Sequence, residues 1–175
     1  MSLHGCEHSF EELALDVFPV HLASLINSLR RPLSLRIFLD NSVLIPTLPG
    51  CYVISQQETP IYVGIAKNMR RRIQDHLSGD PSRANLAVRM AAKEVGVKLL
   101  AIKKHPQFVP TFESAKNNLL NCGVSWVDIE NPLEMYIFEP YCAMKLNTCE
   151  YNFFDTLQIL HPKNIRGHNT VEPTR

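Results

Sequence analysis

The sequence lacks the features that mark several protein classes. None of its apolar runs approaches the ~20 residues of a membrane-spanning helix, and its first residues lack the basic start and apolar centre of a secretory signal. No internal repeat or low-complexity segment is found. The formal net charge is only +1, which counts against indiscriminate nucleic-acid binding. We therefore expect a globular protein with no membrane partner, whose function depends on local features.

The cysteines and histidines also exclude several kinds of site. The five cysteines are scattered and odd in number, and no two of them form a Cys-x-x-Cys pair. This pattern argues against a structural zinc site and against a disulfide framework. It predicts a reducing, cytoplasmic location. The histidines other than His76 form no ligand-spaced set, so no role is assigned to them.

Two tyrosine triplets are the most informative feature that is present. Residues 50–52 read Gly-Cys-Tyr and residues 62–64 read Tyr-Val-Gly, and both lie in strand-like runs. The polar segment 55–60, which ends in a proline, is typical of a turn between them. Because strand side chains alternate between faces, a hairpin would place Tyr52 and Tyr62 on the same face of a sheet.

A basic helix is predicted directly after this hairpin. Asn68 is a suitable N-cap, and the helix has an expected buried stripe of Met69, Ile73 and Leu77. Arg72 and His76 stand four positions apart and share one edge of this helix. Four basic residues lie within six positions, and we expect them to form a phosphate-facing patch: Lys67, Arg70, Arg71 and Arg72.

The remaining pattern predicts an α+β fold, with a small three-stranded, mostly antiparallel sheet flanked by helices. Residues 1–45 are expected to form an N-terminal helical extension, 46–160 the main domain and 161–175 a polar tail. In the extension, Ser9 and Glu12 form a capping box, and Pro19 is expected to interrupt the helix that follows.

Further helices and one strand are expected in the second half of the chain. The pattern predicts a helix from Asp80 to about residue 92, and a second one that Thr111 caps. Residues 97–102 fit either a strand or a helix. Residues 124–129 alternate apolar and polar side chains, which predicts the third strand. Asn131 then caps a helix to about residue 144.

The two triplets and the basic helix together resemble the GIY-YIG nuclease superfamily. The resemblance covers roughly residues 49–154, and it implies a divalent-metal-dependent endonuclease that hydrolyses DNA phosphodiester bonds. Family members carry an arginine in the first helix and a histidine or tyrosine one turn later, which match Arg72 and His76. Catalytic roles are therefore implied for Tyr52, Tyr62, Arg72 and His76, and either tyrosine could orient or deprotonate the attacking water.

The family also carries a metal-binding acidic residue in the helix after the third strand. Glu139 and Glu134 both qualify, but Glu134 falls at a helix position where glutamate has a structural role. Glu139 stands among mostly apolar neighbours, where a carboxylate is costly unless it is paired or binds a cation. Family members follow this residue with an asparagine, and Asn152 lies thirteen positions after Glu139. Glu139 is therefore the predicted metal ligand, with Glu134 as the alternative.

The resemblance also implies a cofactor and partners. One Mg²⁺ or Mn²⁺ ion per site, held by a single glutamate, is sufficient for such a centre. DNA is the expected partner, and an enzyme that cuts both strands with one site per chain is expected to act as a homodimer. Asn152 is expected to hold the backbone or a tyrosine in place.

Two other functions are consistent with the sequence. One is a catalytically weak nucleic-acid-binding module of the same fold. Two departures support it: a cysteine inside the first triplet, and Ile65 where excinuclease-like members often carry a lysine. The other is a protein-binding domain that uses the apolar N-terminal helices.

Overall fold

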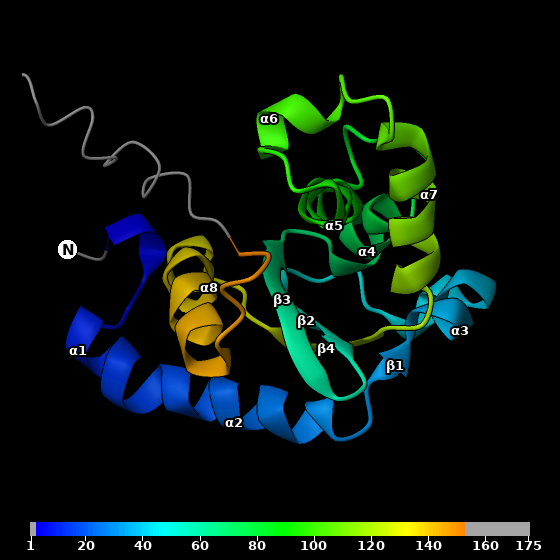
Figure 1. Cartoon of the computed structure of the whole chain (residues 1–175). Helices are drawn as coiled ribbons and strands as arrows, with labels where there is room; N and C mark the ends of the chain where they lie inside the picture. The colour runs from blue at the N-terminus through cyan, green and yellow to red at the C-terminus, as the bar shows by residue number, and fades with distance from the viewer. Residues whose placement is uncertain (1–2, 153–175) are drawn as a thin grey trace, which may run out of the picture.

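The computed structural model of the chain describes residues 3–152, and within them it contains one antiparallel sheet (Figure 1). The strand order is β1-β4-β2-β3, so β2 lies inside the sheet and β3 at its edge. The strands are β1 Leu33–Ser34, β2 Gly50–Gln56, β3 Thr59–Ala66 and β4 Gly123–Asp128. The predicted α+β class is confirmed. The predicted strand number was one too low, because β1 pairs with β4 through only two residues.

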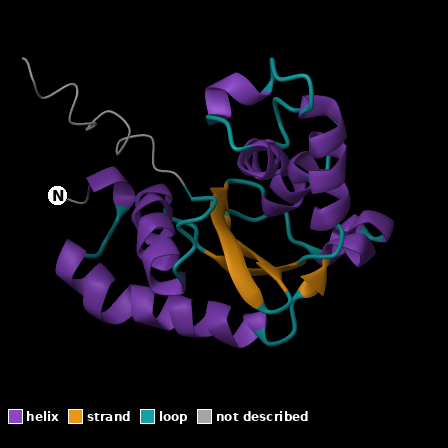
Figure 2. Cartoon of the chain, viewed as in Figure 1, coloured by secondary structure: helices purple, strands orange, loops and turns teal. Residues whose placement is uncertain are grey.

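Helices cover both faces of this sheet (Figures 1 and 2). One face is covered by the N-terminal helices and the last helix: α1 Phe10–Glu12, η2 Leu13–Val17, α2 Phe18–Leu29 and α8 Pro132–Leu146. The other face carries α4 Met69–His76, α5 Asn85–Val95, α6 Leu99–Ile102 and α7 Phe108–Leu119. Three short pieces complete the described fold: η1 Leu3–Gly5, α3 Leu35–Asp40 and η3 Ser42–Leu44.

Each face of the sheet has its own hydrophobic core. The core under α4, α5 and α7 contains Tyr52 and Tyr62 from the hairpin. The core under α2 and α8 contains Cys51, Val53 and Val63 from the same two strands. This division follows from strand geometry, since neighbouring residues of a strand point to opposite faces. The prediction that both phenols lie on one face is confirmed.

The β2–β3 hairpin is tighter than the sequence suggested. Both strands extend into the expected turn segment, and only Gln57 and Glu58 connect them. These two residues have φ values of 47° and 67°, which is the left-handed region that two-residue hairpin loops use. The register pairs Tyr52 with Gly64 and Ile54 with Tyr62.

The N-terminal helices follow the prediction at their start. The capping box is present, because the Ser9 amide donates to the Glu12 carboxylate at 2.6 Å and the Glu12 amide donates to the Ser9 hydroxyl at 3.2 Å. The expected interruption at Pro19 was wrong. A π-helical turn at 13–17 precedes α2, and Pro19 falls in the first turn of α2, where a missing backbone N–H is tolerated.

Two other predicted helix starts were wrong for a similar reason. The helix α5 begins at Asn85, and Asp80 instead closes a turn by accepting from the Ser82 amide at 2.8 Å. The helix α7 begins at Phe108, and the Thr111 hydroxyl lies inside it, donating to the Gln107 carbonyl at 2.7 Å. Asp80 accepts a backbone N–H as a cap would, whereas Thr111 bonds back to the preceding turn from inside the helix, and residue type alone did not separate these cases from a cap.

The described helices include none that is long and apolar enough to cross a membrane. The division of the chain at residue 45 stays a prediction. Although β1 lies in the predicted extension, it belongs to the same sheet as the hairpin. The predicted tail at 161–175 and the end of the main domain at 153–160 lie outside the described residues.

Candidate active site

The centre of the candidate site is a hydrogen bond between β2 and α4. The Tyr52 hydroxyl lies 2.7 Å from Nε2 of His76, and both side chains are fully buried. The Tyr62 ring lies beside them, with ring centroids 6.3 Å from Tyr52 and 5.5 Å from His76. The hairpin and the first helix after it therefore bring the two tyrosines and the histidine into one aromatic cluster.

The glycine of the second triplet makes room for the tyrosine of the first. Tyr52 lies across Gly64, and a Cβ at Gly64 would come within 2.4 Å of the Tyr52 hydroxyl oxygen. Gly50 is equally restricted, since a Cβ there would lie 2.3 Å from the carbonyl oxygen of Val127 in β4. Steric contacts therefore require glycine at both positions. A larger residue at Gly64 would displace the Tyr52 phenol, and one at Gly50 would displace a strand.

The three clustered side chains are held in their neutral forms by burial. Burial raises the pKa of Tyr52 well above its ordinary value, Tyr62 raises it further, and the guanidinium of Arg72 lowers it. Burial also raises the pKa of Tyr62, and here Arg89 and Arg72 oppose the effect. Burial lowers the pKa of His76 well below its ordinary value, in the same direction as both arginines. A neutral imidazole therefore faces the Tyr52 hydroxyl near neutral pH.

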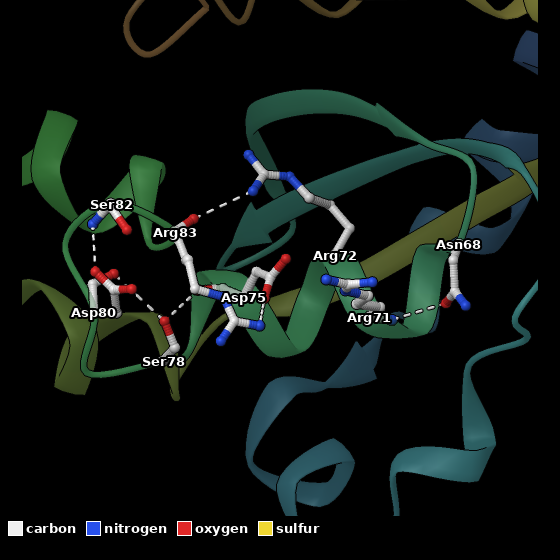
Figure 3. Close-up of polar contacts among 8 residues, drawn as sticks. All are labelled: Asn68, Arg71, Arg72, Asp75, Ser78, Asp80, Ser82 and Arg83. Atoms are coloured by element: carbon white, nitrogen blue, oxygen red, sulfur yellow. Dashed lines mark hydrogen bonds and ion pairs between the residues drawn. The ribbon is translucent and has the colours of Figure 1, made fainter.

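Arg72 reaches from α4 toward this cluster. Its Nη1 donates to the carbonyl oxygen of Arg83 at 3.2 Å, in the loop after α4 (Figure 3). The side chain of Arg83 forms an ion pair with Asp75 of α4, which holds this loop against the helix. Its charge and hydrogen bonding lower the pKa of both Tyr52 and Tyr62. The side chain is half-buried. Arg72 is therefore held beside the phenols rather than extended into solvent.

Arg70, one of the four residues of the predicted basic patch, also has a structural role. Its Nε donates to the carbonyl oxygen of Ile45 at 2.8 Å, and its Nη2 donates to that of Val43 at 3.3 Å. These bonds hold the segment before β2 against α4. Lys67 and Arg71 are exposed. That these four basic residues face a phosphate stays a prediction.

The two candidate glutamates of α8 face different surroundings. Glu134 accepts from the thiol of Cys6 at 3.4 Å, and its charge acts on Cys6 and His21 in the N-terminal part of the chain. Glu139 lies one and a half turns later, and its charge raises the pKa of Tyr52, Tyr62 and Cys51. The charge of Glu139, and not that of Glu134, therefore acts on the two tyrosines.

The surroundings of Glu139 fit a hard cation. Burial raises the pKa of Glu139, and the charges of Arg89 and Arg72 oppose the rise. The salt bridges found among residues 3–152 do not include Glu139. Residues 3–152 also contain no group of three or more Asp, Glu, His or Cys side chains that could hold a metal together. A single carboxylate whose charge acts on the two phenols suits Mg²⁺, which keeps several of its waters, better than it suits zinc.

Asn152 fixes the outer edge of β3 next to Tyr62. Its Oδ1 accepts from the Val63 amide at 2.9 Å, and its Nδ2 donates to the Val63 carbonyl at 2.7 Å. This pair of bonds takes the place of a neighbouring strand at the free edge of the sheet. Asn152 therefore fixes the backbone from which Tyr62 projects, although it lies far along the chain.

One residue of the site was missed at the sequence level. Arg89 of α5 lies with its guanidinium carbon 6.0 Å from the centroid of the Tyr62 ring, and its charge acts on Tyr62, His76 and Glu139. A lone arginine on an amphipathic helix carries no signal for such a place. Only the packing of α5 against α4 brings Arg89 to the tyrosines.

Part of the chain matches a known protein family. Residues 48–117 match the family model of the GIY-YIG catalytic domain. The matched range includes Tyr52, Tyr62, Arg72 and His76, whereas Glu139 lies beyond it. No curated protein matches the chain significantly.

Solved structures that resemble the chain include the GIY-YIG N-terminal endonuclease domain of UvrC from Thermotoga maritima. Its magnesium-bound form has 19% identity and a TM-score of 0.39, and the match covers 67% of this chain and 97% of that domain. A tyrosine-to-phenylalanine point mutant bound to its catalytic divalent cation matches with the same identity and coverage and a TM-score of 0.40.

The family match confirms the predicted GIY-YIG domain, and with it the prediction of an enzyme of the phosphodiester hydrolase class at the level of the family. The roles of the single site residues, the homodimer and the cytoplasmic location stay predictions.

Proposed function

Because residues 48–117 form a GIY-YIG catalytic domain, we propose that this chain is a divalent-metal-dependent endonuclease that hydrolyses DNA phosphodiester bonds. The observation that carries the proposal is the convergence of four elements on one place. The groups that interact there are two phenols from β2 and β3, an arginine and a histidine from α4, and a carboxylate from α8. One phenol is hydrogen-bonded to the histidine, and the charges of the arginine and the carboxylate act on both phenols. This set contains the groups that hydrolysis of a phosphodiester needs: a proton acceptor, a cation for the phosphate and a carboxylate for a metal.

Glu139 would hold the metal ion, Mg²⁺ or Mn²⁺. When bound, such an ion supplies Lewis-acid stabilisation of the negative charge that develops on the phosphate and on the departing oxygen. The rise in the pKa of Glu139, caused by burial, supports this role. A partly buried carboxylate that has no salt bridge among the described residues is stabilised when a cation binds beside it.

Arg72 would bind the non-bridging oxygens of the scissile phosphate. Its guanidinium offers a planar set of donors that matches a phosphate. The half-buried position supports this role, because a charge interaction is stronger where water is partly excluded. The bond to the carbonyl of Arg83 holds the arginine in place before substrate arrives.

Tyr62, rather than Tyr52, would accept the proton of the attacking water. The two phenols differ in access: Tyr62 is 7% exposed, while Tyr52 is 0% exposed and is bonded to His76. The step needs the deprotonated form of Tyr62, which burial disfavours and the charges of Arg89 and Arg72 favour. The water oxygen bonds to phosphorus, its proton passes to the Tyr62 phenolate and the bond from phosphorus to the 3′ oxygen breaks. The 3′ oxygen then takes a proton from solvent. Tyr52 and His76 would fix the position of Tyr62 through the aromatic cluster.

Cleavage of supercoiled plasmid DNA tests the proposal. Wild-type protein is incubated with Mg²⁺, Mn²⁺ or EDTA, beside Glu139→Gln and the matched control Glu134→Gln. We expect nicked or linear DNA with either cation and none in EDTA, loss of cleavage in Glu139→Gln, and wild-type cleavage in Glu134→Gln. Folded wild-type protein that binds DNA but never cuts it would instead support a binding module, and equal cleavage by both variants would refute the role of Glu139.

The same assay distinguishes the two tyrosines. Because a base must be deprotonated, the cleavage rate should rise by up to about tenfold per pH unit while the Tyr62 phenol is protonated. Tyr62→Phe should lower the rate by about 10²- to 10⁴-fold and flatten this rise. Tyr52→Phe should keep the rise with pH. If Tyr52→Phe flattens the profile and Tyr62→Phe does not, the assignment of the base is reversed.

A further inference from the structure

Arg89 lies on a part of the fold that none of the sequence motifs includes. It belongs to α5, which packs beside α4 and against α7 in the helical layer over the tyrosine face of the sheet (Figure 1). Its guanidinium carbon lies 6.0 Å from the centroid of the Tyr62 ring, and its Nη1 donates to the carbonyl oxygen of Tyr151. The side chain is half-buried. The arginine is therefore held beside the Tyr62 ring.

The contact with Tyr151 connects Arg89 to the β3 edge. The next residue, Asn152, makes both of its side-chain bonds to the backbone of Val63, directly after Tyr62. Lys93, one turn further along α5, pairs with Glu150 of the same segment. The segment 150–152 is thus held to α5 on one side and to β3 on the other. This frame sets where the Arg89 guanidinium lies relative to Tyr62.

The two arginines approach the cluster from different elements. Arg72 of α4 acts on both tyrosines and on Glu139, and Arg89 of α5 acts on Tyr62 and Glu139. Burial raises the pKa of Tyr62 and of Glu139, and the charges of Arg89 and Arg72 both oppose the rise in each case. Two positive charges therefore act on both Tyr62 and Glu139. A phosphodiester would lie next to these two residues during hydrolysis.

The charge of the surrounding segment fits the same ligand. Residues 80–120 carry seven Lys or Arg residues against three Asp or Glu residues, whereas the whole chain has a net charge of only +1. This positive excess lies in the loop before α5 and in α5 to α7, and Asp75 and Glu150 from outside the segment offset part of it by pairing with Arg83 and Lys93. The positive charge that remains favours binding of the DNA backbone.

We propose that Arg89 is a second phosphate-binding residue of the site, which together with Arg72 holds the DNA backbone across Tyr62. The inference rests on the proposed function, because it assumes that DNA is the substrate. A guanidinium can donate to a carbonyl and to a phosphate at the same time, since it carries five N–H donors in a planar arrangement. The bond to Tyr151 then sets the orientation of the donor that reaches the phosphate.

DNA binding without cleavage tests this role. The dissociation constant of a short fluorescent duplex is measured in EDTA over a series of salt concentrations, for wild type, Arg89→Gln, Arg89→Lys and the control Arg31→Gln. Glutamine keeps a donor for the Tyr151 carbonyl but lacks the charge, and Arg31 is an exposed arginine between α2 and β1. Thermal unfolding of each variant reports the loss of stability separately.

We expect Arg89→Gln to weaken binding about tenfold and to reduce the salt slope by about one. Arg89→Lys should keep the wild-type slope, and Arg31→Gln should bind like wild type. Wild-type affinity and slope in Arg89→Gln would overturn the proposal even if that variant cuts more slowly, since Arg89 would then only position its neighbours. An equal loss in Arg31→Gln would overturn it as well. If wild-type protein binds no DNA, the proposed function itself fails, which is a different outcome.

Discussion

Strands β2 and β3 send alternate side chains to two faces of the sheet, and the two faces are built in different ways. On the face under α2 and α8 the strands contribute Cys51, Val53 and Val63, and the helices add apolar and aromatic side chains. On the opposite face the same strands contribute Tyr52 and Tyr62, which meet His76 and two arginines. One face of the hairpin therefore packs in an apolar core, and the other face forms part of the candidate site.

The contacts on the two faces differ in how strongly they depend on the orientation of the side chains. The apolar face contains an aromatic cluster in which Phe18 lies 5.4 Å from Phe138 and 5.3 Å from Tyr141, measured between ring centroids. Such packing depends mainly on the area and volume that are buried. The site face depends on one bond of 2.7 Å and on one glycine with no space for a methyl group. Substitutions on the first face should change stability, and those on the second should change activity.

The largest expected effect on stability is at the apolar face. Phe18 is 1% exposed, and Phe18→Ala should lower the free energy of unfolding by about 3–5 kcal/mol. Phe10, which is 69% exposed, provides the matched control, and Phe10→Ala should change it by less than about 0.5 kcal/mol. Urea denaturation measures both. The cleavage rate per folded Phe18→Ala molecule should stay within a factor of a few of wild type, and a large fall in that rate would show that the two faces are coupled.

A smaller effect on stability is expected at Gly64, together with a loss of function. The new methyl group of Gly64→Ala would lie 2.4 Å from the Tyr52 hydroxyl oxygen, so the phenol must leave His76 or β3 must shift. Such overpacking costs about 1–3 kcal/mol. Gly79→Ala is the control, since the nearest atom to its new methyl group would be Lys116 Nζ at 3.8 Å. Wild-type cleavage and stability in Gly64→Ala would show that the fit of the phenol over the glycine is not needed.

The smallest expected effect concerns the pH dependence of stability. The pKa of His76 is lowered by burial and by Arg72 and Arg89, so below about pH 6.5 the unfolded chain binds a proton that the folded chain does not. Stability should therefore fall as the pH decreases from about 6.5, by up to about 1.4 kcal/mol per pH unit. Burial also lowers the pKa of His21, which adds a contribution of the same sign.

His76→Phe removes the His76 contribution and should flatten this slope. The surface variant His8→Gln should keep it. Urea denaturation at several pH values between 5 and 7.5 measures the slope of each protein. An unchanged slope in His76→Phe would contradict a buried neutral imidazole, whatever the absolute stability of the variant.

The features that could be predicted from the sequence depend on short-range signals. The two triplets, the N-cap Asn68 and the N-cap Asn131 each involve residues close together in the chain, and all three appear where they were expected. The preference for Glu139 over Glu134 came from the apolar residues around it and from the spacing to Asn152. In the structure the charge of Glu139 acts on the tyrosines, and Glu134 accepts from Cys6.

The features that were missed depend on contacts between distant segments. Strand β1 has two residues, and only its pairing with β4 makes it a strand. Arg70 looks like a surface cation until the loop at 43–45 is placed against it. Arg89 has no distinguishing neighbour in sequence, and its role follows from how α5 packs. Local patterns could not contain this information.

The most direct test of the account is whether Glu139 binds a metal ion. Electron paramagnetic resonance of Mn²⁺ titrated into the protein counts bound ions without any DNA or cleavage. The account predicts one bound Mn²⁺ per chain in wild type, loss of that ion in Glu139→Gln and retention in Glu134→Gln. Mn²⁺ binding by Glu139→Gln as tight as that of wild type would contradict it.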